Sequence, residues 1–233
     1  MPENVHQLVA GKRQGTEPLS DAEVEKGFKG WYASKHLPHF DAPDTQQFIT
    51  YRLADAMPSA RRSEWEVFLH LEDKLEKQRK IEDYIDRGYG DCSLRDPRIA
   101  QIVQDNLWHH DDVKYRLLAW CIMPNHVHTL IELVQTPLGE ILKSWKSYTA
   151  KQANRLMHRA GMFWEEDYFD HYIRDEEHFR QVARYIEANP VKARLVRTQE
   201  EWAWSSARYR SKQDLSARTL TRPSASRQPP PPE

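Results

Sequence analysis

The sequence predicts an α+β fold in which a small antiparallel sheet carries long helices on one face. An apolar hairpin lies in the middle of the chain, at 113–133, where "VKYRLLAWCIM" and "HVHTLIEL" flank the turn "PN". Segments with the spacing of amphipathic helices come before and after it. The hairpin is apolar enough to be covered by those helices.

The first half of the chain provides one strand and two helical segments. Residues 46–58, "QQFITYRLADAMP", alternate well enough to predict a strand. Residues 59–87 place their large apolar side chains near one helical face, which predicts one long amphipathic helix or two shorter ones. Residues 96–110 predict a further helix, with Asp96 as its N-cap and Pro97 at the first helical position.

Two helices are predicted after the hairpin. Residues 136–161 read as a helix that ends at Gly161. Residues 174–190 read as another, with Asp175 as N-cap and Asn189-Pro190 as its end.

The 233 residues divide into three parts. Residues 1–27 are polar and predict a partly disordered N-terminal extension, residues 28–210 form the globular domain, and the Ser/Arg/Pro-rich tail at 211–233 is expected to be disordered. Two cysteines give no disulfide framework, which favours the cytoplasm. No apolar run reaches the roughly 20 residues of a membrane span, so no membrane partner is expected.

Positive charge is concentrated on one predicted helix, although the net charge of the chain is −1. No acidic residue occurs between positions 141 and 160, and Tyr148 and Gln152 are four residues apart, hence on one face. The basic residues of this helix are Lys143, Lys146, Lys151, Arg155 and Arg159. The pattern fits a phosphate-binding helix, and a solvated basic face is the alternative.

Two histidines, His126 and His128, alternate on the second strand of the hairpin. Alternate strand residues point the same way, about 7 Å apart at the backbone, so both imidazoles can converge on one metal ion. A chance pair on a structural strand is the alternative, and cupins and carbonic anhydrases use the same pattern. Those readings need further ligands, for which the candidates are His158, His171 and His178.

Taken together, "NHVH" and the later "SYTAKQANRL" resemble the HUH single-tyrosine transposases of the insertion-sequence type, in which two histidines flank one hydrophobic residue. The stretches "GWYASKHLPHFD", "FWEEDYFDHYIRDEEHF", "YIEANPVKARLV" and "WAWSSA" resemble more closely the REP-associated tyrosine transposases. The resemblance covers roughly residues 28–209.

The resemblance implies a ferredoxin/RRM-like sheet, with the histidines on a central strand and extra C-terminal helices. It implies metal-dependent cleavage and rejoining of single-stranded DNA hairpins, of repetitive extragenic palindrome type, through a 5′-phosphotyrosine. Carried over by position, His126 and His128 are metal ligands, Gln152 is the third ligand, and Tyr148 is the nucleophile. Neutral imidazoles and an amide suit Mg²⁺ or Mn²⁺.

The resemblance also sets expectations about partners. The REP-associated branch is expected to act as a monomer, on nucleoid DNA in the bacterial cytoplasm, whereas insertion-sequence relatives are dimers that exchange the tyrosine helix. The basic residues of the 136–161 helix are the expected DNA contacts, and Trp164 is either a base-stacking platform or a core residue. The alternative function is a binding-only descendant that grips hairpins without cutting them.

Overall fold

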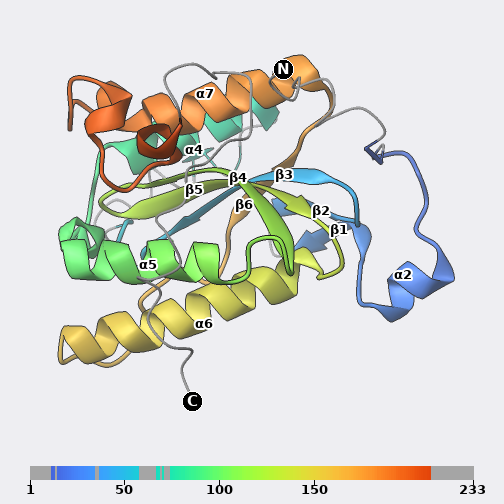
Figure 1. The fold of residues 1–233 in the computed structure, drawn as a ribbon, viewed down its shortest axis with the longest axis horizontal. Helices are drawn as coiled ribbons and strands as arrows, with labels where there is room; N and C mark the ends of the chain where they lie inside the picture. Colours follow the sequence, from blue (N-terminus) through green and yellow to red (C-terminus); the bar gives the residue numbers. More distant parts are fainter. Residues whose placement is uncertain are drawn as a thin grey trace.

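A four-stranded antiparallel sheet forms the centre of the computed structural model (Figure 1). Residues 12–13, 15–34, 37–57, 67–68, 70 and 74–210 are described. The strands are β3 (Gln46–Arg52), β4 (Tyr115–Ile122), β5 (His126–Leu133) and β6 (Phe169–Tyr172), in the order β4-β5-β3-β6. The predicted α+β class is therefore confirmed, and so is the central hairpin.

The connectivity of this sheet is ferredoxin-like. α5 (Pro97–His109) lies in the chain between β3 and β4, and α6 (Leu138–Leu156) lies between β5 and β6. The resulting β-α-β-β-α-β order places β5 in the interior of the sheet, paired with both β3 and β4. The histidines therefore lie on a central strand, as the resemblance implied.

Helices cover both faces of the sheet, which differs from the expected single helical face (Figure 1). α5 and α6 cover one face, whereas α4 (Lys74–Asp86) and α7 (Glu176–Lys192) lie on the other. All eight residues of β5 are buried, because alternate side chains of a strand point to opposite faces and both faces are covered. Only α5 and α6, which lie together on one face, follow the prediction of a single helical face.

Two apolar cores flank the sheet. Val127 and Ile131 of β5 belong to the core that includes the buried side of α6, whereas Leu130 packs with Phe179 and Ile186 of α7. The alternation of β5 thus separates its odd-numbered from its even-numbered side chains. His126 and His128 are even-numbered and face α7.

The helix starts follow the sequence closely. The Asp96 carboxylate accepts a hydrogen bond from the backbone N–H of Arg98 at the start of α5, and Asp175 accepts one from His178 at the start of α7. Both predicted N-caps are confirmed.

Two helix ends differ from the prediction. α6 ends at Leu156 and not at Gly161, because His158 adopts a left-handed conformation (φ 52°) and turns the chain. α7 continues through Pro190 to Lys192, because a proline removes only its own N–H, and the N–H of Ala193 still bonds the Asn189 carbonyl at 2.9 Å.

A second, two-stranded sheet of β1 (Gly30–Ser34) and β2 (Leu37–Asp41) was not predicted. It packs beside β6, and the buried His39 pairs with Asp170 of that strand. A short helix, α2 (Asp21–Glu25), precedes it.

Some expectations fall partly outside the described residues. The helix predicted at 59–87 is described as α4 from Lys74 onward, and the tail at 211–233 and the first eleven residues lie outside the described part. None of the helices that the structure describes combines the length and the apolar character of a membrane span.

Asp41, at the end of β2, gives a test of how the two-stranded sheet joins helix α6. Its Oδ1 accepts the backbone N–H of Leu138, the first residue of α6, at 2.9 Å, and burial raises the pKa of the carboxyl to about 6. A raised folded-state pKa means that stability is full below the unfolded pKa of about 4 and is lost as the pH rises through about 6. At about pH 8, Asp41→Asn should therefore raise the free energy of unfolding by about 2 to 3 kcal/mol, and it should change little near pH 4.

Urea denaturation at both pH values checks this prediction. Asp44→Asn is the control, because Asp44 is exposed and its left-handed conformation (φ 57°) tolerates asparagine. If the change in the free energy of unfolding caused by Asp41→Asn is the same at both pH values, the prediction is wrong.

Candidate metal and tyrosine site

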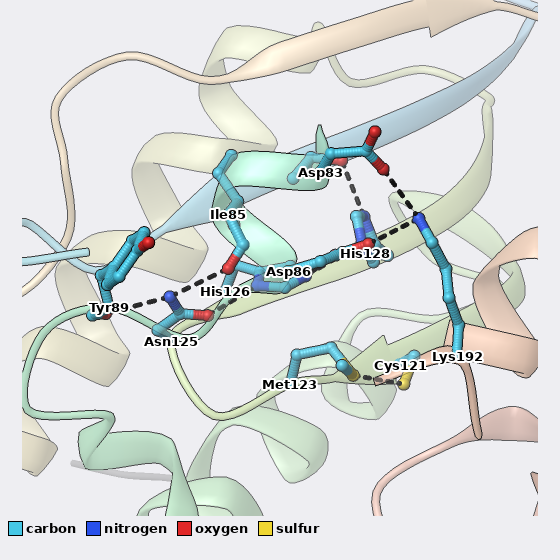
Figure 2. Close-up of polar contacts among 11 residues, drawn as sticks. Asp83, Ile85, Asp86, Tyr89, Cys121, Met123, Asn125, His126, His128 and Lys192 are labelled. Carbon is cyan, nitrogen blue, oxygen red and sulfur yellow. Dashed lines mark hydrogen bonds and ion pairs between the residues drawn. The ribbon is translucent and has the colours of Figure 1, made fainter. Parts of the chain in front are cut away.

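His126 and His128 meet face to edge on the α7 side of β5 (Figure 2). Their Nε2 atoms are 3.0 Å apart, and the side chains are 0% and 1% exposed. Burial lowers the pKa of His126 to about 3 and that of His128 well below its ordinary value. Both imidazoles are therefore neutral near pH 7 and offer lone pairs to a cation.

The other ring nitrogen of each histidine is held by a neighbour. Asn125 donates from its side-chain nitrogen to the carbonyls of Ile85 and Tyr89, so its Oδ1 faces His126 Nδ1 as an acceptor, at 2.8 Å. His126 consequently carries its proton on Nδ1, and its Nε2 is unprotonated, with a lone pair available to a cation. His128 Nδ1 lies 2.8 Å from the Thr50 hydroxyl. Such outer contacts are typical of metal-binding histidines.

Asp86, at the end of α4, completes a group of three possible ligands. Its Oδ1 lies 3.5 Å from His126 Nε2, and one ligand atom from each of the three residues lies within 4.8 Å of the other two. Oδ1 is buried and makes no hydrogen bond. Two neutral imidazoles and one carboxylate are a donor set that fits a divalent cation. Among the described residues this is the one such cluster.

Asp86 was not predicted as a ligand. The sequence places it among other charged residues of an amphipathic helix, and only the folding of α4 over the sheet brings it to the histidines. His158, His171 and His178, the other candidates, are not members of the cluster.

The structure does not bring Tyr148 and Gln152 to the histidines, and this expectation needs correction. Both residues belong to α6, whose buried side packs in the core of Val127, across the sheet from His126. α6 lies with α5 on the same face of the sheet. The sheet therefore separates this tyrosine from the cluster.

A different tyrosine lies at the cluster. The ring of Tyr185, on α7, is 5.5 Å from the ring of His128 and meets it edge-on. Burial, with the charges of Glu82 and Asp86, raises the pKa of this phenol well above its ordinary value. Asn189 follows one helical turn later and is buried.

Sequence reasoning missed Tyr185 and Asn189, although a signal was present. The stretch "YIEAN" has the same four-residue spacing between a tyrosine and an amide as "YTAKQ". Spacing alone did not reveal which helix covers the histidine face.

The predicted DNA contacts divide into exposed and structural residues. Lys143, Lys151 and Arg155 are exposed on α6, at intervals of four or eight residues that align them in one stripe. Lys146 instead donates to three backbone carbonyls at 165–167, and burial lowers its pKa to about 8. Arg159 bonds Asn154 and lies over a phenylalanine ring.

Trp164 is a core residue. It is 4% exposed, and its indole N–H donates to the Thr149 hydroxyl at 2.8 Å. Of the two alternatives for this residue, the structure therefore favours packing over base stacking.

Comparisons with known proteins find similar sequences for part of this chain. Residues 96–189 match the family model described as "Transposase IS200 like". A REP-associated tyrosine transposase of Escherichia coli K12 is 27% identical over 97 residues, which cover 41% of this chain and 56% of that relative. The matched part of the chain is therefore similar in sequence to the REP-associated tyrosine transposases.

Two further relatives are similar. A Haemophilus influenzae protein, provisionally named as a REP-associated tyrosine transposase, is 26% identical over 103 residues, 40% of this chain and 58% of that protein. A solved structure of a REP-associated tyrosine transposase bound to a REP hairpin has a TM-score of 0.47 and 16% identity, over 83% of this chain and 96% of that one. The chain thus spans little more than half of the curated relatives that it matches.

Metal binding tests the cluster directly. His126→Ala, His128→Ala and Asp86→Asn should each weaken Mn²⁺ binding, because each removes one donor. Thr50→Val should weaken it by about 10-fold or more, since it removes the group that orients His128.

Calorimetric titration with Mn²⁺ checks these variants, with His109→Ala as the control, because His109 is exposed on α5. Unchanged affinity in both histidine variants would rule out the cluster as the binding site.

Proposed function

We propose that this protein cleaves and rejoins single-stranded hairpin DNA through a covalent 5′-phosphotyrosine, with Tyr185 as the nucleophile. The observation that carries the proposal is the position of Tyr185 against the buried cluster of His126, His128 and Asp86. The relationship to REP-associated tyrosine transposases supports the same chemistry. Tyr185 thereby replaces Tyr148 in the role that the sequence suggested.

In the proposed reaction the Tyr185 oxygen forms a bond to the phosphorus of the DNA, and the bond from phosphorus to the 3′ oxygen breaks. The phenol loses its proton, and the departing 3′ oxygen gains one, so the step is balanced. The covalent intermediate conserves the phosphodiester energy for rejoining. Mg²⁺ or Mn²⁺, held by the cluster and by Asn189 in place of Gln152, would supply positive charge to the phosphate oxygens.

DNA binding and chemistry are proposed to use opposite sides of the sheet. The exposed stripe of Lys143, Lys151 and Arg155 offers positive charge to the phosphates of a hairpin, away from the cluster. We expect a monomer that acts on nucleoid DNA, with Tyr185 and the histidines in the same chain.

The identity of the nucleophile is tested with a matched pair of variants. Tyr185→Phe should fold and bind DNA but form no covalent adduct, because only the reacting oxygen is removed. Tyr148→Phe, on the other face, should retain adduct formation. Both are read from a denaturing gel of labelled single-stranded hairpin DNA, drawn from palindromic repeats, after incubation with Mn²⁺.

The reverse result, with the adduct lost in Tyr148→Phe and kept in Tyr185→Phe, would restore the nucleophile first suggested by the sequence. If the wild-type protein binds hairpins yet yields neither adduct nor cut strand, the binding-only alternative holds.

The salt dependence of binding tests the α6 stripe. Each phosphate neutralised on a single strand contributes about −0.7 to the slope of log affinity against log salt. Changing Lys143, Lys151 and Arg155 together to Glu should flatten that slope, as measured by fluorescence anisotropy.

A triple variant with Lys26, Arg174 and Arg197 changed to Glu carries the same change in net charge on exposed positions elsewhere and should keep the slope. Equal slopes for the two triple variants would mean that DNA does not bind α6.

A further inference from the structure

The face of α7 that carries Tyr185 also carries a positive charge. Tyr185, Asn189 and Lys192 follow one another at intervals of four and three residues, which places them along one side of the helix. The Lys192 ammonium lies 5.5 Å from the centre of the Tyr185 ring.

Lys192 is paired with two aspartates of α4 (Figure 2). Its Nζ is 2.9 Å from Asp86 Oδ2 and 3.2 Å from Asp83 Oδ1. The other oxygen of Asp86 faces His126. The ammonium is therefore separated from the two histidines of the cluster by a single carboxylate, that of Asp86.

The exposure of Lys192 and Asp83 indicates that the ion pair between these two side chains is exchangeable. The Lys192 and Asp83 side chains are each 48% exposed, whereas Asp86 is 9% exposed. The pair with Asp83 joins two half-exposed groups, and ion pairs of that kind contribute little to stability. The long, unbranched stem of a lysine can also move its ammonium without moving the helix.

We propose that Lys192 binds a charged oxygen of the reacting DNA phosphate, and that its pairing with Asp83 and Asp86 is its position in the DNA-free protein. The inference rests on the proposed function and extends it to a further residue. The Lys192 ammonium lies 5.5 Å from the Tyr185 ring on one side and 2.9 Å from Asp86 of the cluster on the other. A phosphate that contacts both Tyr185 and the cluster would therefore lie close to this ammonium. The lysine acts as a fixed positive charge, so no proton transfer is assigned to it.

A pair of substrates separates charge recognition from a structural role. One is a labelled hairpin oligonucleotide that the wild-type protein cleaves, and the other carries a methylphosphonate at the reacting position, which removes the negative charge there. Lys192→Met should slow adduct formation on the phosphodiester by about 100-fold, the usual cost of removing one group that stabilises developing charge. On the neutral methylphosphonate the same variant should react at nearly the wild-type rate.

Two further variants are matched controls. Lys192→Arg keeps the charge and should retain most of the rate on the phosphodiester. Asp83→Asn breaks one ion pair but leaves the ammonium in place, so it should react like the wild type on both substrates. Should Lys192→Met fail to fold, as judged by thermal melting, Lys192→Gln is measured in its place.

Two results overturn the inference alone, namely a normal rate for the charge-removing variant on the phosphodiester, or an equal loss on both substrates. Absence of any adduct with the wild-type protein instead overturns the proposed function and this inference together.

Discussion

The burial of β5 on both of its faces is the constraint on which the rest of the structure depends. A strand in the middle of a sheet that is covered on both sides must send every side chain into one of two interiors. Val127 enters one, and the two histidines that flank it enter the other. Polar groups in such an interior need partners, which Asn125, Thr50 and Asp86 supply.

α7 is held against this interior from its other side. Glu187, two residues after Tyr185, is buried and accepts a hydrogen bond from Ser206 at 2.6 Å, and it also pairs with Arg210. The segment that carries those two residues is itself bonded to β4, through the Trp204 carbonyl and the indole of Trp202. α7 is thus fixed both to the sheet that it covers and to the C-terminal end of the described chain.

Local features of this protein could be predicted from the sequence, and features that depend on the faces of the sheet could not. The hairpin, its paired histidines and the caps Asp96 and Asp175 follow from short-range patterns. The choice between Tyr148 and Tyr185 does not, because both precede an amide by four residues. That choice depends on which helix lies over which face, and this is decided by contacts between residues far apart in the chain.

The same distinction explains the remaining differences. Lysine and tryptophan are residue types that often contact DNA, but the polar atoms of Lys146 and Trp164 form hydrogen bonds within the chain itself. An aspartate in a charged helical segment is usually solvated, yet Asp86 lies beside His126. In each case the tertiary position of the side chain, and not its type, decides its role.

The sheet that separates α6 from the histidines has a consequence for how such a protein can change. Substitutions on the exposed side of α6 and substitutions around His126 share no partners, so their free-energy effects should be independent. Under the proposed function, selection can therefore alter DNA binding by α6 without disturbing the histidine cluster, and a lineage can lose one property while it keeps the other. The two layers of helices can therefore evolve independently, although both pack on the same central strand, β5.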